Sequence, residues 1–306
     1  MMRTLLVLLS LHAACDRPSE GSEPRPAGGE ATSETEETRA EGDAPDPDRT
    51  HAARPPRIAP PDLSDWGTLL ATYVAEDGGF RYQALMANED HLAALERAVV
   101  AIGGAQDQGW ESTEALTFYV NAYNALTVAA VLEAWPTRSV MQVEGFFDTV
   151  THRVAGGSMT LNELENDILR SDRFDEPRIH FLVNCASKGC PPLSRELYTP
   201  DGIDTTMALA ARRYVRATTE LGSHRVKISR LFEWFAEDFG GAEGVRRFVA
   251  DQLEGEAAEH VRNERTTLGY RDYDWSLNAV AEPEVTNDQG AGDEGGAGGS
   301  SDAQTP

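Results

Sequence analysis

Apolar residues recur at spacings of three and four along much of residues 63–280, which is the pattern of amphipathic helices. Glycine pairs, prolines or an N-terminal capping sequence mark the bounds of several of these segments. Thr160 and Glu163 form one such capping sequence. The pattern predicts helices over residues 63–76, 89–101, 113–134, 160–170, 204–218, 230–239 and 243–254, and a short connector over 80–85.

The segment over residues 113–134 is apolar on nearly every face, which predicts a central, buried helix. Thr117, Asn121 and Asn124 interrupt the apolar pattern and share one helix face. An asparagine is costly to bury without hydrogen-bond partners. The two amides therefore either hold a neighbouring loop in place or line a site.

Strand-like segments are short and few. Residues 146–159 alternate around a glycine pair, which predicts a hairpin. The apolar run at 180–183 fits a buried strand, and residues 226–228 and 270–277 fit two more. Strands and helices do not alternate as they do in a parallel sheet. The predicted fold class is α+β, a helix-rich single domain with a small antiparallel sheet.

Composition limits this domain to residues 63–280. Residues 16–62 hold nine of the sixteen prolines and few large apolar residues, and residues 281–306 are Gly-rich and acidic. Such segments bury too little apolar surface to offset their ordering entropy. They predict a disordered tether before the domain and a disordered tail after it.

The first fifteen residues have the layout of a secretory signal peptide: Arg3, an apolar stretch and the small pair Ala13-Ala14. Cys15 follows directly, which resembles a bacterial lipoprotein signal in which that cysteine is lipidated. His12 departs from that pattern, so the alternatives are an ordinary cleaved signal and a wrongly assigned start of the protein. The expected location is the bacterial cell envelope, with the domain facing the periplasm or the exterior and held to the membrane by a lipid anchor only.

The chain carries a net charge of −24. Residues 16–62 and 281–306 each carry −6 and residues 1–15 carry +1, which leaves −13 for the domain. An acidic surface repels phosphate backbones, so nucleic acid is not an expected partner. No GxSxG, P-loop, dinucleotide or HExxH motif occurs, and no cofactor or metal is expected.

The segment HFLVNCASKGCPPL, residues 180–193, holds the candidate chemistry. Cys185 would lie where the predicted strand gives way to a loop, and a reactive thiolate would need a nearby base. His180 is five residues away, roughly 16 Å along a strand and on its opposite face, so a dyad needs a bend. The other histidines of the domain that could serve are His152 and His224.

Two further interpretations of the same cysteines remain open. In an oxidising compartment Cys185 and Cys190 could form a disulfide. Together with His180 they also give H-x4-C-x4-C, a marginal spacing for zinc that lacks a fourth ligand. Glu165 borders the buried face of its predicted helix and could point either inward or to solvent.

Four motifs, FYVNAYNAL, TLNELENDILR, RIHFLVNCASKGCPPL and YDWSLN, resemble the DUF547 family in order and spacing, over about Trp66 to Asn278. The resemblance implies a papain-like or transglutaminase-like fold with a reactive cysteine–histidine pair. Matched by position, the catalytic candidates are Cys185, His180 and Glu165. The supporting or substrate-binding candidates are Asn121, Asn124, Asn184 and Ser187.

The expected function is a cell-envelope cysteine hydrolase, similar to a peptidase, that attacks an amide or peptide bond of a small peptide-like substrate through a Cys185 thiolate. The alternative is a non-catalytic lipoprotein that binds a small ligand or a protein partner in the same cleft, with the disulfide closed.

Overall fold

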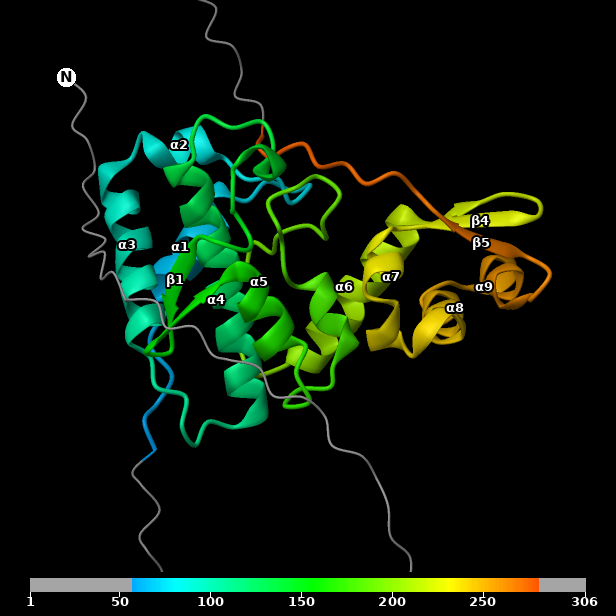
Figure 1. The fold of residues 1–306 in the computed structure, drawn as a ribbon, viewed down its shortest axis with the longest axis horizontal. Coiled ribbons are helices and arrows are strands. Elements are labelled where there is room, and N and C mark those ends of the chain that lie inside the picture. Colours follow the sequence, from blue (N-terminus) through cyan, green and yellow to red (C-terminus); the bar gives the residue numbers. More distant parts are fainter. Residues whose placement is uncertain (1–56, 281–306) are drawn as a thin grey trace, which may run out of the picture. The chain divides into compact units, whose positions relative to one another are not determined.

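The structure, a computed structural model, describes residues 57–280 (Figure 1). The predicted signal peptide with Cys15, most of the predicted tether over 16–62, and the predicted tail over 281–306 lie outside the described residues. The elements of the described part fall into a first half that ends in the disulfide loop and a second half that begins with a long helix.

The first half begins with the helices α1 (Ser64–Tyr73), α2 (Tyr82–Met86), α3 (Glu89–Gly104) and α4 (Ser112–Glu133). Helix α3 packs against the other three. Helix α2 was not predicted, since its five residues are too few to show a helical period. Helix α4 is buried on nearly all of its faces, as predicted. It is long and apolar enough to cross a membrane, but its apolar stretch is mostly buried inside the protein.

The predicted hairpin is confirmed: β1 (Thr151–Val154) pairs antiparallel with β2 (Gly157–Thr160), and β1 packs on α3. The capping box is also confirmed. The Thr160 hydroxyl accepts from the Glu163 N–H, and the Glu163 carboxylate accepts from the Thr160 N–H. The helix that follows is irregular: one α-turn, α5 (Leu161–Glu163), leads into a π-helical segment, η2 (Leu164–Leu169).

The strand predicted over residues 180–183 is wrong. After the short 3₁₀ turn η1 (Val140–Gln142), a second 3₁₀ helix, η3, spans Pro177–Phe181. The Glu176 carboxylate accepts from the Arg178 N–H at its start, and Pro177 suits a first helical position. Three consecutive side chains of η3 are buried, so the run is apolar without the alternation of a strand.

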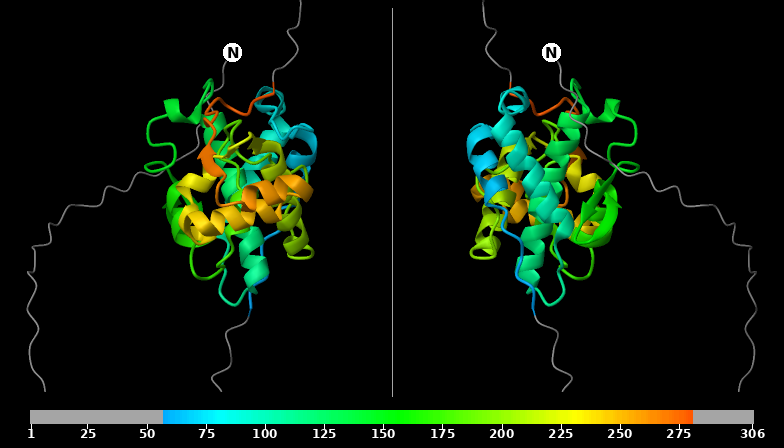
Figure 2. Two further views of the ribbon diagram at one scale, coloured as in Figure 1. Left: turned by 90° about the vertical axis from the view of Figure 1, so that its right-hand side faces the viewer. Right: turned by 90° about the vertical axis from the view of Figure 1, so that its left-hand side faces the viewer.

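The second half carries a three-stranded sheet and further helices. Helix α6 (Ile203–Thr218) leads to β3 (Glu220–Leu221) and β4 (Arg225–Ile228), which pair antiparallel. Next come α7 (Leu231–Trp234), η4 (Ala236–Phe239), α8 (Gly241–Asp251) and the unpredicted α9 (Gly255–Arg262). In Figure 1, α8 and α9 lie at the right-hand end of the domain and α1 to α3 at the left-hand end, and Figure 2 shows the domain from each of these two ends.

The last strand, β5 (Thr267–Tyr270), pairs parallel with β4. The strand predicted over 270–277 is therefore displaced, and only its first residue belongs to β5. The rest runs back across the domain (orange in Figure 1) and pairs with the disulfide loop, where the Lys188 and Gly189 N–H groups donate to the Ser276 and Asp274 carbonyls. This return of the chain carries Tyr273 and Trp275 to the candidate site.

Two clusters of buried apolar side chains form the core. The first gathers around α1, α3 and α4, and the second gathers around Phe181 with α6, β4 and α8. The α+β class, helix-rich with a small sheet, is confirmed, although one strand pair of that sheet is parallel. Phe181 reaches into the second cluster, whereas Ile179 and Leu182 on either side of it pack in the first. Helix α6 also joins the clusters, with Met207 in the first and Ala211 in the second.

Candidate functional site

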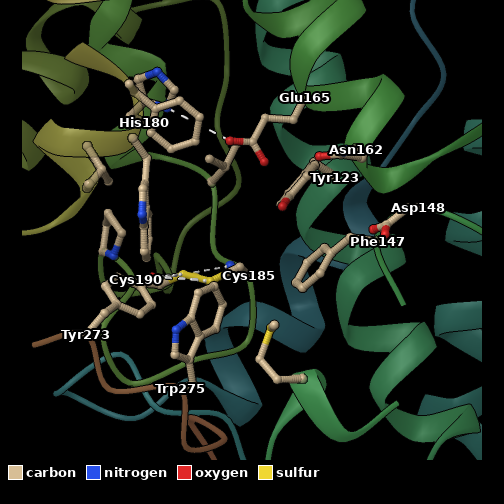
Figure 3. Close-up of a pocket in the computed structure, with 16 residues that line it drawn as sticks. Tyr123, Phe147, Asp148, Asn162, Glu165, His180, Cys185, Cys190, Tyr273 and Trp275 are labelled. Atoms are coloured by element: carbon tan, nitrogen blue, oxygen red, sulfur yellow. Dashed lines mark hydrogen bonds and ion pairs between the residues drawn. A yellow bond between two sulfur atoms is a disulfide. The ribbon is translucent and has the colours of Figure 1, made fainter. Parts of the chain in front are cut away.

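A pocket of about 260 Å³ lies where the two clusters meet (Figure 3). Its walls combine Tyr123 and Val183 from the side of the first cluster with Leu231, Trp234 and Phe235 from the side of the second. Polar groups enter from several elements: Glu165 from η2, His180 from η3, and both cysteines of the loop. The charged side chains of the lining are Asp148 and Glu165, and it includes no lysine or arginine.

His180 is held in one orientation. Its side chain is 1% exposed, its ring stacks on Phe235 with centroids 4.0 Å apart, and Nε2 lies 2.7 Å from Asp238 Oδ2. Because an ionised carboxylate only accepts, Nε2–H must be the donor. Nδ1 is buried, has no hydrogen-bond partner among the described residues, and lies 3.9 Å from Glu165 Oε1.

Asp238 is fixed from its other side. Arg170 donates two hydrogen bonds to its carboxylate, at 2.7 and 2.8 Å, and the guanidinium also lies over the Phe235 ring. Burial alone would raise the pKa of Asp238, but the hydrogen bonds from Arg170 and His180 outweigh it and hold that pKa well below its usual range. Asp238 is therefore an anion that anchors the imidazole.

Glu165 has the opposite environment. Its side chain is 15% exposed, and burial raises its pKa, opposed in part by His180 and by the Tyr123 phenol beside it. Burial also raises the pKa of Tyr123, and the neighbouring Glu165 raises it further. Between its two predicted orientations, Glu165 takes the inward one and faces His180 across the pocket (Figure 3).

Cys185 and Cys190 form a disulfide, with Cα atoms 6.2 Å apart. In this form Cys185 has no thiol, so the thiolate nucleophile expected from the sequence is not present. No hydrogen bond joins Cys185 to His180 within residues 57–280, although both line the pocket. The chain does bend between His180 and Cys185, as a dyad of these two residues would require. However, η3 directs the imidazole toward Asp238 and Glu165 and not toward Cys185.

The asparagine candidates support the loop instead of lining the pocket. Asn124 accepts from the Asn184 N–H and donates to the Leu182 carbonyl, at 2.8 and 2.9 Å. Asn121 donates to the Tyr198 carbonyl. Asn184 bridges the loop, since it accepts from the Ala186 N–H and donates to the Pro191 carbonyl. Of the two roles weighed for the amides of α4, holding a neighbouring loop is the one that these contacts fit.

The remaining candidates lie away from the pocket lining. The Ser187 hydroxyl is buried without a hydrogen-bond partner among the described residues. His152, on β1, and His224 are not among the residues that line the pocket. No group of three or more His, Cys, Asp or Glu within residues 57–280 is placed to hold a metal ion, and the two cysteines of the proposed zinc set are bonded to each other.

Sequence reasoning missed Asp238, Arg170, Tyr123 and Tyr273. Arg170 follows Glu165 by five residues, and side chains at that spacing share a helix face only in a π-helix. No sequence pattern predicts where a π-helical segment occurs. Asp238 is remote in the chain. Tyr273 had a signal, because it opens the motif YDWSLN, but that segment was interpreted as a strand.

Comparison with known proteins finds a family match for part of this chain. Residues 108–215 match the family described as "Protein of unknown function, DUF547". The match confirms the resemblance over α4, Glu165, His180 and both cysteines, and it ends before Asp238 and Tyr273. No curated protein and no solved structure matches the chain. The papain-like or transglutaminase-like fold, the lipoprotein type and the catalytic roles stay predictions beside the DUF547 match.

Proposed function

We propose that the pocket is the active site of a hydrolase that cleaves an amide or peptide-like bond, with Glu165 as the group that exchanges protons with the substrate. One observation carries the proposal: Glu165, His180 and Asp238 form a line of three groups. Glu165 lies on the pocket wall and can exchange a proton with His180, and the Asp238 anion holds the imidazole from its other side. Environments that push the pKa values of two carboxyls apart are typical of acid–base pairs.

The line of groups can serve both halves of an amide hydrolysis. Glu165 passes its proton to Nδ1 of His180, and the Asp238 carboxylate neutralises the imidazolium. The Glu165 carboxylate then accepts a proton from water as the water oxygen bonds to the carbonyl carbon. The same proton goes to the leaving nitrogen as the C–N bond breaks, and His180 returns its proton to Glu165. The products are one carboxylic acid and one amine.

The lining of the pocket favours a neutral or cationic substrate. Its acidic side chains are Asp148 and Glu165, it includes no lysine or arginine, and much of the remaining wall is aromatic or aliphatic. Phosphate esters would be repelled by this wall. An amide needs a proton donor for its leaving nitrogen, which the protonated Glu165 supplies.

The state of the disulfide decides the nucleophile. With Cys185 bonded to Cys190, water is the attacking group, and the thiolate route expected from the sequence requires the bond to be opened. The second candidate function is a binding protein without catalysis. The observation that favours it is a wall of three packed aromatic rings, Trp234, Tyr273 and Trp275, next to the closed disulfide.

The test uses purified full-length protein without reductant and a panel of aminoacyl 4-nitroanilides as probes. We expect hydrolysis by the wild type, loss of activity in Glu165→Gln and a fall of about a hundredfold or more in His180→Gln. Asp167→Asn, an exposed carboxylate in the same helical segment, is the matched control and should keep full activity.

A double variant, Cys185→Ser with Cys190→Ser, separates the two nucleophiles. Water attack predicts that this variant still hydrolyses the probes. Activity that needs reductant and is lost in the double variant would instead establish the thiolate route. If none of the probes were hydrolysed while a Glu165→Gln-sensitive complex with one of them could be measured by calorimetry, the binding function would replace the hydrolase.

We also propose that the protein acts in the bacterial cell envelope, anchored through a lipid on Cys15. What supports this is the order of Arg3, the apolar stretch and the small pair before Cys15. Expressed in a bacterium with lipoprotein processing, the protein should fractionate with membranes, and Cys15→Ser should release it. A wild-type protein found only in the soluble fraction would contradict the anchor.

A further inference from the structure

We infer that the Cys185–Cys190 disulfide is a thiol–disulfide exchange centre, at which a partner thiolate attacks Cys185 Sγ and Cys190 departs as a thiolate. The inference does not depend on hydrolysis. A purely structural disulfide would not exchange with partner thiols. The inference is based on the position of the bond, the contacts of its two sulfur atoms and the hydrogen bonds that hold the loop.

The disulfide lies at a boundary between two cavities. Both cysteines line the pocket of about 260 Å³ (Figure 3). Cys190 and Tyr273 also line a second cavity of about 460 Å³. Cys185 is half-buried, whereas Cys190 is 9% exposed. A thiol that enters the first pocket therefore meets Cys185 as the more accessible of the two.

The two sulfurs differ in their hydrogen bonds. Cys190 Sγ accepts from the Cys185 N–H at 3.0 Å and from the Tyr273 hydroxyl at 3.1 Å. Cys185 Sγ lies 3.4 Å from the same Tyr273 hydroxyl, so this one hydroxyl contacts both sulfur atoms. Hydrogen bonds to a sulfur stabilise its thiolate, and a stabilised thiolate leaves faster in exchange. Burial raises the pKa of Tyr273, so its hydroxyl keeps the proton that it donates.

The loop is held in place by contacts other than the disulfide. Asn184 joins its two ends through Ala186 and Pro191, at 2.9 and 2.8 Å. The Lys188 and Gly189 N–H groups donate to the returning chain. Opening the bond therefore leaves Cys190 close to Cys185, and a thiol kept close reacts at a high effective concentration.

The exchange is balanced in electrons. The partner thiolate forms a bond to Cys185 Sγ as the bond to Cys190 breaks, and the electron pair of that bond stays on Cys190. A second partner thiolate attacks the sulfur of the first, which releases a partner disulfide and leaves Cys185 as a thiolate. Two partner thiols are oxidised and one protein disulfide is reduced. Cys190 can reverse the first step by attacking Cys185 Sγ again.

The test follows mixed-disulfide formation on the oxidised full-length chain carrying Cys15→Ser, so that Cys185 and Cys190 are the remaining cysteines. Reduced glutathione is the small-thiol probe, and a short peptide with one cysteine is the peptide-thiol probe. After an acid quench, intact mass gives the adduct and a peptide map gives its position. We expect one adduct, on Cys185. In Cys190→Ser, where Cys185 is a free thiol, oxidised glutathione supplies the disulfide, and the adduct that it leaves on Cys185 should persist because no resolving thiol is present.

Tyr273→Phe keeps the ring and removes the donor to the leaving sulfur, so exchange should slow by about tenfold. Tyr270→Phe, in β5 and outside both cavities, is the matched control and should exchange at the rate of the parent chain. Reaction with glutathione alone would identify small thiols as partners, and reaction with the peptide as well would identify peptide or protein thiols. An adduct spread equally over both cysteines, a Tyr273→Phe rate equal to the parent rate, or no adduct with either probe would overturn the inference.

Discussion

Two carboxyl groups on either side of one imidazole have opposite protonation tendencies, and the cause is visible residue by residue. Asp238 receives two hydrogen bonds from Arg170 and one from His180, all of which favour its anion. Glu165 is buried, and no cation lies in hydrogen-bond contact with it among the described residues, which favours its neutral form. Neighbours, more than residue type, set what each carboxyl can do.

Glu165 should make the stability of the protein depend on pH. Burial raises its folded-state pKa above the ordinary glutamate value of 4.5, so above pH 4.5 the folded state binds more protons than the unfolded one. The free energy of unfolding contributed by this group is thus fully present below pH 4.5 and is lost as pH rises through the folded pKa. Urea unfolding at stepped pH values should show this loss in wild type and not in Glu165→Gln.

The exposed Glu144 provides a control for that comparison. Glu144→Gln should keep the wild-type dependence, because this substitution leaves Glu165 and its surroundings unchanged. If wild type and Glu165→Gln had parallel unfolding curves across this pH range, Glu165 would titrate as an ordinary carboxyl and would not be the proton donor of the proposed reaction.

Asn124 should contribute to stability through the loop it holds. Asn124→Leu leaves the Asn184 N–H and the Leu182 carbonyl without their partners, and unpaired buried groups cost about 1–3 kcal/mol. Chemical denaturation should show that loss. Gln106→Leu, an exposed amide with no hydrogen bond to any other residue of 57–280, is the control and should lie near wild type. Equal midpoints for Asn124→Leu and wild type would mean that the loop relaxes to pair these groups otherwise.

At the scale of elements, the sequence predicts best where burial has a period. Helices α1, α3, α4, α6 and α8 and the β1–β2 hairpin lie close to their predicted positions. Short elements were predicted less well. α2 and α9 have too few residues for a period, and η3 buries consecutive side chains, so its apolar run gave the wrong strand. The parallel β4–β5 pair depends on a contact that no local pattern contains.

The residues of the site were likewise predicted where they lie in sequence motifs, and their contacts were missed where these depend on the fold. Cys185, Cys190, His180 and Glu165 lie in motifs, and the structure brings all four to one pocket. The disulfide was one of the interpretations left open by the sequence, and the structure has it. The approach of Glu165 to His180 could not be predicted, because it depends on the π-helical segment η2 and on η3, neither of which has a clear sequence signature. Asp238 joins the site from a distant element, and only the fold brings it to His180.

The disulfide loop and the returning chain form one packed unit, and Gly189 is the residue that allows it. A Cβ at Gly189 would lie 2.9 Å from three atoms of the Tyr273 ring. Gly189→Ala should therefore displace Tyr273 and disturb its packing with Trp234 and Trp275, which near-ultraviolet circular dichroism and tryptophan fluorescence would report. Gly104→Ala, where a Cβ would meet no atom within 4 Å, should leave both spectra unchanged.

At the scale of the whole molecule, the pocket occupies the junction of two hydrophobic clusters, which is where ligand sites are often found. A short length of chain beside the disulfide loop contacts both clusters. Phe181 packs in the second cluster, its neighbours Ile179 and Leu182 pack in the first, and the disulfide loop begins three residues after Leu182. Changes in that loop therefore act on the coupling between the clusters as well as on the pocket.

Reducing the disulfide tests that coupling. A bond between residues five apart closes a small loop, and the entropy of such a loop in the unfolded chain is worth about 2 kcal/mol. Urea unfolding with a phosphine reductant should show a loss of that size, and the double variant Cys185→Ser with Cys190→Ser should match it. Because the Asn184 hydrogen bonds hold the loop ends independently, near- and far-ultraviolet circular dichroism should still give one coincident transition. Two separate transitions after reduction would show that the disulfide itself joins the clusters, and its opening would then disrupt the proposed active site instead of leaving it in place for exchange.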